Sequence, residues 1–457
     1  MKLKVKKKET TFDILNKKID SLIEIIIPMI ILLIPVLFVL YVLNIHGYIF
    51  PKVNGEPIFS LHKYYFYLMI VLSLIYVYKL CVMRIKITKS DIFLFIFMFW
   101  TIISTLTSYN KSIAINGYPG RYEGLFAILF YIFLYLDCKF LKNKESIFEY
   151  IKYMLFTAVI HFIVVVLQLS GLYGKVIYMY TSNTAIGLTE NCNFLGSLMC
   201  TFAMISVACY MLFSKKKDDL YFLFIFIVSY ATLLLANSTG PFISFIFSLI
   251  LFIIYLIVKK QLVLKKVLVV VCCLIVLYPV CLYKKDTITP DIKSHTAYIV
   301  SKVKGLFSKQ SESSSDEVID NMDIEVRNLG NGRIRIWSNV FKLIKKRPLL
   351  GYGPDNLGLV YEKSADDNKI ADKAHNIYLH IWVSSGIFAL IGYVLWIIYT
   401  IYLGIKNDNP LVVCLIFGVI VYSIQGLFNI NVLEVTPYFY LILGFAMLLV
   451  NEKKLQL

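Results

Sequence analysis

The sequence predicts an all-α integral membrane protein that crosses the bilayer many times. Of its 457 residues, 59% are apolar and only 16% are charged, which lies far outside the composition of soluble globular domains. The apolar residues also gather into runs near the ~20 residues that a helix needs to cross a bilayer. Basic residues collect between alternate runs, as they do in cytoplasmic loops of membrane proteins.

Runs of this kind recur along the whole chain and predict about twelve membrane-spanning helices. They cover residues 21–43, 64–83, 91–107, 124–141, 151–170, 193–213, 220–236, 241–258, 267–283, 377–405, 410–429 and 435–450. Short or interrupted runs can instead form re-entrant segments. This alternative applies to residues 91–107 and to the two runs on either side of the Asn237-Ser-Thr-Gly-Pro241 turn.

The distribution of lysine and arginine predicts the orientation of these helices. Basic residues gather in the N-terminal tail and in every second loop after it: Lys2 to Lys18, Arg84 to Lys89, Lys139 to Lys144, Lys215 to Lys217, Lys259 to Lys266, Lys406, Lys453 and Lys454. These segments, and both chain ends with them, are expected in the cytoplasm. The net charge of +17 is then explained by topology and by anionic lipid headgroups, without a nucleic-acid partner.

The expected organisation is a single polytopic membrane domain over residues 1–457. The first apolar run is long and lacks a small-residue cleavage site, so we expect it to remain as an anchor. Residues 284–376 form a large extracytoplasmic loop between the ninth and tenth helices. Within it, residues 308–323 mix serine with acidic residues and are expected to be mobile.

Residues 333–347 of this loop form a predicted amphipathic helix that lies in the membrane interface. Its apolar residues recur at helical spacing: Ile336, Val340, Phe341 and Ile344. Two interpretations of its basic residues stay open. The helix rests on anionic lipid, or Arg333 and Arg335 hold a phosphate or diphosphate, because the guanidinium fork matches phosphate oxygens.

A His-Asn pair, His375 and Asn376, directly precedes the tenth predicted span. A histidine at the membrane surface is neutral near pH 7 and could accept a proton from a hydroxyl, although an incidental interfacial histidine has the same pattern. Asn376 could orient the ring, bind a sugar or cap the helix. His161 lies within a predicted span, where hydrogen bonding between helices is the alternative to a functional role.

Two further polar segments are predicted on the same side of the membrane. Arg121 and Glu123 lie at the outer end of the fourth helix, either as an ion pair or as part of a site. Asn191 and Asn193 lie at the outer end of the sixth, either as helix caps or as acceptor ligands. Arginines, a glutamate and a histidine thus converge on one membrane surface, as binding of a lipid diphosphate would require.

The order of these segments is itself informative. It runs GRYEG at 120–124, GLTENCNFLG at 187–196, Ser-Thr-Gly at 238–240, RIRIW at 333–337, RPLLGYG at 347–353 and then His-Asn before an aromatic-rich helix. This order resembles the bacterial O-antigen ligase and O-antigen polymerase superfamily from about residue 116 to residue 386. His375, Asn376 and Gly386 keep the spacing of the family. Ala389 departs from its usual Gly, Thr or Tyr, and Thr239 from an arginine found in many members.

The resemblance implies glycosyl transfer from an undecaprenyl diphosphate-linked glycan in the bacterial cytoplasmic membrane, without a metal, a cofactor or a nucleotide sugar. The catalytic residues are expected to be His375 and Asn376. Three arginines are expected to hold the diphosphate: Arg333, Arg335 and Arg121. Three polar residues are expected to bind the acceptor: Glu123, Asn191 and Asn193. The expected partners are the lipid-linked donor, a glycan or protein acceptor and membrane lipids.

Two other functions stay open. An O-linked protein oligosaccharyltransferase would have a similar site and differ in its acceptor. A flippase or transporter of lipid-linked oligosaccharide belongs to another class and would be expected to bury several charges at mid-membrane or to show paired repeats. The predicted gathering of charges at the outer surface favours an enzyme.

Overall fold

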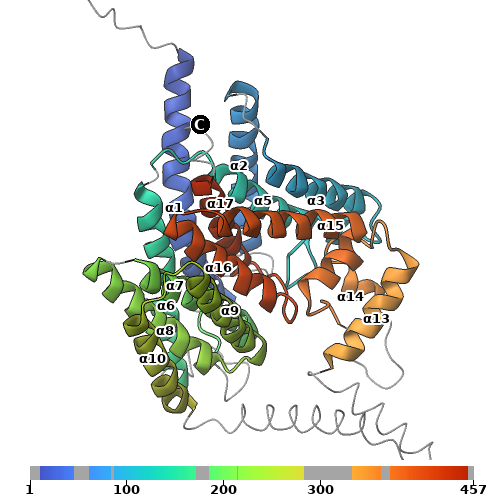
Figure 1. The fold of residues 1–457 in the computed structure, drawn as a ribbon. Helices are drawn as coiled ribbons and strands as arrows, with labels where there is room; N and C mark the ends of the chain where they lie inside the picture. The colour runs from blue at the N-terminus through green and yellow to red at the C-terminus, as the bar shows by residue number, and fades with distance from the viewer. Residues whose placement is uncertain are drawn as a thin grey trace, which may run out of the picture.

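The computed structural model describes residues 11–45, 61–83, 87–143, 145–170, 185–213, 215–282, 332–361 and 371–450. Within these residues every regular element is a helix (Figure 1). In chain order they are α1 (Thr11–Ile45), α2 (Leu61–Met83), α3 (Lys89–Leu106), α4 (Lys111–Asn116), α5 (Leu125–Cys138), α6 (Glu145–Leu169), α7 (Cys192–Leu212), α8 (Lys216–Ala236), α9 (Thr239–Val258), α10 (Leu264–Leu282), α13 (Arg333–Lys346), α14 (Leu357–Val360), α15 (Ile377–Ile405), α16 (Pro410–Gln425) and α17 (Thr436–Val450). The all-α prediction is confirmed.

Each of the twelve predicted apolar runs coincides with a helix. In the described part of the chain, nine helices are long and apolar enough to cross a membrane, namely α1, α2, α3, α6, α7, α8, α9, α10 and α15. They include α3, α8 and α9, the three runs for which a re-entrant segment was the alternative. The other three, α5, α16 and α17, have 14, 16 and 15 residues, fewer than the ~17 that crossing requires. The chain is therefore a polytopic membrane protein in which length supports nine spans.

Burial explains why α16 and α17 tolerate their short length. A helix that is apolar all round is stable when other helices surround it. Nearly every residue of α7, α16 and α17 is buried, and α16 packs against both other helices. By contrast, α10 exposes most of its apolar side chains, as expected for a helix that faces lipid. The bundle thus has a central group of helices and a peripheral group.

α15 is continuous along the chain but kinks at Gly386, where φ is +83°. A Cβ atom there would lie 1.9 Å from the carbonyl oxygen of Leu349, so only glycine fits. The kink lets the turn after α13 pack against the first segment of α15. Backbone N–H groups bond across this contact, from Ile387 to Pro348 at 3.0 Å and from Tyr352 to Val383 at 2.9 Å.

α13 confirms the amphipathic helix predicted for residues 333–347, but its apolar face contacts protein. Its buried residues Val340, Leu343 and Ile344 pack in one cluster with residues of the following turn and of α15: Tyr352, Leu357, Tyr361, Ala374 and Val383. The cap formed by α13, α14 and the start of α15 thus covers part of this face (Figure 1). Phe341 is 43% exposed, and the placement of the helix in the membrane interface stays a prediction.

Charged residues gather at both ends of α5. Beyond its C-terminal end, Lys139 pairs with Asp91, and nearby Asp20 pairs with Lys79 and Lys142. Before its N-terminal end lies Glu123, about 21 Å away at 1.5 Å per residue. The separation agrees with the predicted placement of these loops on opposite sides of the membrane, which stays a prediction. Residues 308–323 lie outside the described residues.

Candidate functional site

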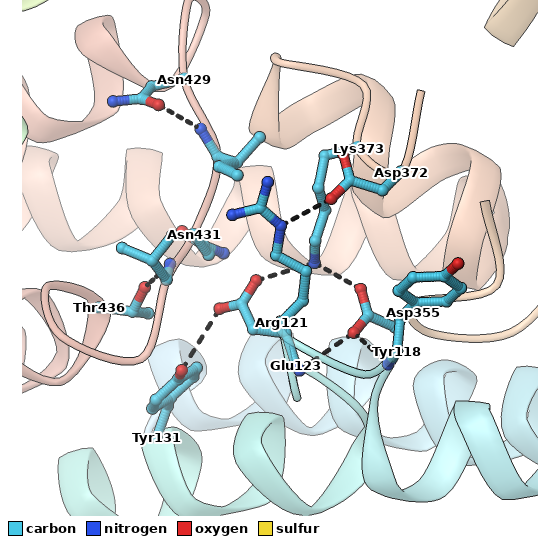
Figure 2. Close-up of polar contacts among 12 residues, drawn as sticks. Tyr118, Arg121, Glu123, Tyr131, Asp355, Asp372, Lys373, Asn429, Asn431 and Thr436 are labelled. Carbon is cyan, nitrogen blue, oxygen red and sulfur yellow. Dashed lines mark hydrogen bonds and ion pairs between the residues drawn. The ribbon is translucent and has the colours of Figure 1, made fainter. Parts of the chain in front are cut away.

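Three segments far apart in the sequence meet beside the N-terminal end of α5: the loop 117–124, the turn 351–356 and the segment 371–376 (Figure 2). Lys373 lies at their centre with a side chain that is only 1% exposed. Its Nζ is 3.0 Å from Oε2 of Glu123 and 2.6 Å from Oδ1 of Asp355. Pairing with two carboxylates is what allows this ammonium group to be buried.

Asp355 joins the turn to the loop before α5. Its Oδ2 accepts backbone N–H groups from Tyr118 at 2.7 Å and from Glu123 at 3.1 Å. Its backbone has the left-handed φ of +58°, a conformation that non-glycine residues adopt mainly where the surroundings enforce it. The carboxylate thus compensates for a strained backbone by satisfying two loop amides and one buried lysine.

The carboxyl of Glu123 is enclosed by the same cluster. Besides Lys373, Tyr131 donates a hydrogen bond to its Oε1 at 3.3 Å. Burial raises the pKa of Glu123 and outweighs the opposing charge of Lys373. For Lys373 the balance is reversed, because the charges of Asp355 and Glu123 outweigh burial and raise the pKa of the ammonium group. Lys373 is therefore charged at neutral pH.

Arg121 pairs with Asp372, not with Glu123. Its Nε donates to Oδ2 of Asp372 at 2.6 Å (Figure 2), so the ion pair that the sequence allowed between Arg121 and Glu123 is replaced by two pairs with residues before α15. Although burial opposes the effect, the guanidinium group lowers the pKa of Asp372. Among the described residues the terminal nitrogens of Arg121 make no further hydrogen bond, which leaves them available to an anion.

His375 follows this cluster by two residues and is held at a left-handed φ of +49°. Within the described part of the chain, its imidazole ring has no hydrogen-bond partner. Burial and the charge of Arg333 lower its pKa, and Asp372 only partly opposes them. The ring is therefore neutral near pH 7 and able to accept a proton.

α13 reaches this segment through Trp337, whose indole N–H donates to the carbonyl of Ala374 at 2.9 Å. The contact places the first turn of α13, with Arg333 and Arg335, near the His375 segment. Burial lowers the pKa of Arg333, yet a guanidinium group stays protonated in proteins. The site thus combines a neutral base with guanidinium groups from two separate elements.

The asparagines predicted to belong to the site lie at the starts of helices, where their side chains make hydrogen bonds within the protein. Asn376 caps α15 by accepting the N–H of Leu379 at 3.0 Å. Asn191 caps α7 by accepting the N–H of Asn193 at 2.8 Å, and Asn193 accepts the hydroxyl of Ser238 at 2.6 Å. The capping alternatives considered for Asn376 and Asn191 are therefore what the structure shows, and Asn193 links α7 to the turn before Thr239.

His161 is likewise engaged in packing. Its Nδ1 accepts the N–H of Leu188 at 3.2 Å, which ties α6 to the loop before α7. Sequence reasoning missed Asp355, Asp372 and Lys373, although they lie beside the recognised GYGP and His-Asn segments. Their charges, next to a Gly-Pro turn and a candidate base, could have drawn attention to them. The spacing of residues in the sequence does not show which groups they pair with.

Comparison with known proteins adds two findings. A family profile described as O-Antigen ligase matches residues 222–394, from α8 to the second segment of α15. A Haemophilus influenzae protein described as "Uncharacterized protein" is 30% identical over 121 residues, which is 25% of this chain and 30% of that protein. The chain thus matches less than a third of the length of this curated relative. The region matched by the family profile contains α13, Asp355, Lys373 and His375, whereas Arg121 and Glu123 precede it.

Proposed function

We propose that this chain is a glycosyltransferase of surface polysaccharide assembly. A family profile described as O-Antigen ligase matches its residues 222–394 and supports this proposal. The protein transfers or polymerises glycan from a polyprenyl diphosphate carrier, undecaprenyl diphosphate in particular, onto an acceptor hydroxyl. The reaction takes place at the outer face of the bacterial cytoplasmic membrane. The described residues supply a base and cationic groups for this reaction.

The observation that carries the proposal is the environment of His375. Its ring has no partner among the described residues and is kept neutral by burial and by Arg333. Arg121, also near this segment, has terminal nitrogens that make no hydrogen bond to any other described residue and can bind an anion. A free base beside guanidinium groups is what transfer from a diphosphate-linked sugar requires.

In the proposed step the donor sugar moves from the diphosphate to the acceptor oxygen. His375 takes the proton of the acceptor hydroxyl as its oxygen forms a bond to the anomeric carbon of the donor sugar. The bond between that carbon and the diphosphate oxygen breaks, and its electron pair leaves with the diphosphate. Arg121, Arg333 and Arg335 stabilise the growing negative charge. Asn376 positions the histidine indirectly by fixing the start of α15.

The ion cluster helps to hold His375 in place. Lys373 lies two residues before His375 and is fixed by carboxylates from two other segments. Catalytic groups need to be held to a fraction of an ångström in order to align with their substrates. A buried cluster next to the base provides such a fixed point without contacting the reacting atoms.

The direct test uses purified protein in proteoliposomes with a polyprenyl diphosphate-linked glycan as donor. General-base catalysis is worth ~10²- to 10⁴-fold, so His375→Ala is expected to lower transfer at least about 100-fold. Asn376→Ala should cost less, because it acts through the helix start. The amounts of folded protein, measured by size-exclusion chromatography, provide the control. Transfer by His375→Ala at nearly the wild-type rate would contradict the assignment of the base.

A second measurement examines the diphosphate site. Arg333→Lys and Arg335→Lys keep the charge but lose the planar fork, so the KM for the donor should rise. Lys342→Arg, exposed on the same helix, is the matched control. If both lysine variants and both alanine variants leave the donor KM unchanged, these arginines serve lipid headgroups instead.

A further inference from the structure

A small cavity lies between the ion cluster and the first segment of α15. The cluster contributes Glu123, Asp355 and Lys373 to its wall, and α15 contributes His380 and Ser384. Most of the residues that line it are buried, and the centre of a water molecule can occupy about 40 Å³ of it. One water needs about 10–15 Å³ on this measure. The cavity therefore has room for at least one water molecule but not for a sugar.

Two polar atoms on the α15 side of this cavity have no protein partner. Within the described part of the chain, Nδ1 of His380 and the hydroxyl oxygen of Ser384 are both buried and make no hydrogen bond. A serine in a helix often bonds to the carbonyl group four residues earlier, but Ser384 does not bond to His380 in this way. Because buried polar atoms normally have a partner, these two atoms indicate a small polar ligand in the cavity.

The backbone of α15 fixes these two side chains in place. His380 and Ser384 are four residues apart and so lie on the same face of the helix. The carbonyl of Ser384 accepts the N–H of Gly353 at 2.8 Å and the hydroxyl of Ser104 at 2.7 Å. These bonds hold the segment against α3 and against the turn after α13. The unpartnered atoms therefore belong to a fixed part of the wall.

The wall on the other side of the cavity carries the charges of the ion cluster (Figure 2). Oδ1 of Asp355 lies 2.6 Å from Nζ of Lys373. A carboxylate oxygen has two lone pairs, so this atom can accept a further hydrogen bond. Polar cavities of sufficient size hold water, whereas apolar ones stay dry. The chemistry of both walls thus suits a water molecule.

We propose that an ordered water molecule occupies this cavity and bonds to Nδ1 of His380, the hydroxyl of Ser384 and Oδ1 of Asp355. Buried waters typically make about three such bonds. With the proton of His380 on Nε2, the water donates to His380 and to Asp355 and accepts from Ser384. A metal ion is a poor alternative, because the described residues contain no group of three or more His, Cys, Asp or Glu side chains arranged to hold one.

This water makes His380 and Ser384 positioning residues for His375, an inference that rests on the proposed glycosyltransferase function. Lys373 precedes His375 by two residues, and His380 follows it by five. The water ties His380 to the same ion cluster that holds Lys373, so the base is anchored on both sides. Displacing a catalytic group by ~1 Å can cost about 100-fold in rate. Loss of the water should therefore slow transfer without weakening donor binding.

The first measurement looks for the water itself, in a cryo-electron microscopy map of the full-length protein in nanodiscs at a resolution that shows ordered waters. Density is expected between His380, Ser384 and Asp355. A map that shows other buried waters but none at this place would overturn the proposal. A direct hydrogen bond from His380 or Ser384 to another protein group would overturn it as well.

The second measurement uses kinetics of purified variants in proteoliposomes. His380→Leu removes Nδ1 and should lower kcat at least about tenfold, while the donor KM stays within about twofold. His380→Asn keeps a polar atom close to the position of Nδ1 and should restore most of the lost kcat. Ser384→Ala should also lower kcat. Its matched control is Ser244→Ala, since Ser244 is buried and its hydroxyl bonds within its own helix to Gly240 at 2.8 Å.

The outcomes separate this inference from the proposed function. If the wild type shows the water but transfers no glycan, the water site stands and the enzymatic function fails. If it transfers glycan and neither His380→Leu nor Ser384→Ala lowers kcat, the function stands and the positioning role fails. If His380→Leu does not fold, the wild-type map and the kinetics of Ser384→Ala still decide the question.

Discussion

Lys373 shows at the scale of a residue how the site is held together. Its ammonium group is shared by Glu123 and Asp355, and these carboxylates also hold Tyr131 and two backbone amides. Such a cluster adds little net free energy to folding. Removing one member is nevertheless destabilising, because it leaves a buried charge without a partner. The neighbouring His375 takes its position from this fixed segment.

Substitution of Lys373 by methionine should therefore destabilise the protein strongly. The side chains have similar length, but the carboxylates of Glu123 and Asp355 would be left without their cation. Breaking a buried pair in this way costs about 3–5 kcal/mol, which thermal unfolding of the purified protein would report as a lower melting temperature. Lys342→Met on the exposed face of α13 is the control. Equal melting of the two variants would show that the carboxyls become protonated at little cost.

The pH dependence of transfer follows from the lowered pKa of His375. The base must be neutral, so transfer is complete above its pKa and is lost as the pH falls through it. Burial and Arg333 lower that pKa, and the acidic limb of kcat/KM should therefore lie below the ordinary value of ~6.5.

Arg333→Gln removes a neighbouring positive charge and should move this limb to higher pH, whereas Lys342→Gln should leave it in place. A limb at or above pH ~6.5 that does not respond to Arg333→Gln would contradict the assignment of His375 as the titrating group.

At the scale of elements, the kink in α15 connects the membrane bundle to the cap. The first segment of α15 carries the Asn376 cap, and its last carbonyls accept N–H groups from the turn after α13. Gly351 in that turn is also too close for a side chain, since a Cβ there would lie 2.5 Å from the carbonyl oxygen of Ser384. The spacing between His375 and Gly386 thus sets the length of the segment between the base and the kink.

Gly386→Ala tests this arrangement. The added Cβ would collide with the carbonyl of Leu349, and alanine is strained at φ +83°. Strain of this kind costs on the order of 1–3 kcal/mol before the collision is counted, so the melting temperature should fall and transfer should fall with it. Ser385→Ala, one residue earlier in the helical segment, is the matched control. If both variants melt alike, the kink does not depend on glycine.

At the scale of the whole molecule, charged groups lie at both ends of α5. This agrees with the prediction that the two ends of α5 face opposite sides of the bilayer. Asp20, Lys79 and Asp91 lie in α1, α2 and α3, close in sequence to the basic segments predicted to be cytoplasmic, and their partners Lys139 and Lys142 belong to one of these segments. The site belongs to loops predicted on the other side. The proposed reaction needs this polarity, because acceptor and donor would meet outside the cytoplasm.

A cysteine introduced at Ser313 examines the predicted topology directly. Residues 308–323 are expected outside the cytoplasm, so this cysteine should react with a membrane-impermeant maleimide in intact cells that lack an outer barrier. Ser146→Cys, beside the basic loop before α6, should react only after the membrane is opened. The unmodified chain gives the background from its native cysteines. Protection of the Ser313 cysteine in intact cells would reverse the orientation and remove the site from the outer face.

The chain alone was sufficient to predict the helices, because the signals are local. Apolar runs and the 3.6-residue period of α13 depend only on neighbours in the sequence. Local signals were weaker at the ends of elements. α1 begins at Thr11, ten residues before the apolar run, because its first turns are polar. The helices α4 and α14 have only 6 and 4 residues, too few to show a helical period, and were not predicted.

The sequence was sufficient to predict which polar segments form the site. It was not sufficient to predict which charged side chains pair with each other. The sequence placed Arg121, Glu123, Arg333 and His375 on one side of the membrane. Only the packing of the helices decided that Arg121 pairs with Asp372, 251 residues away, and that Glu123 pairs with Lys373, 250 residues away.

The physical reason is that hydrophobicity is a property of each segment, whereas electrostatic partners are chosen by distance in space. A charge in a loop has many candidate partners along the chain, and the sequence does not rank them. The kink at Gly386 likewise arises only where distant segments come into contact. The sequence by itself thus determined the class, the helices and the polar segments, and tertiary packing decided which of their groups act together.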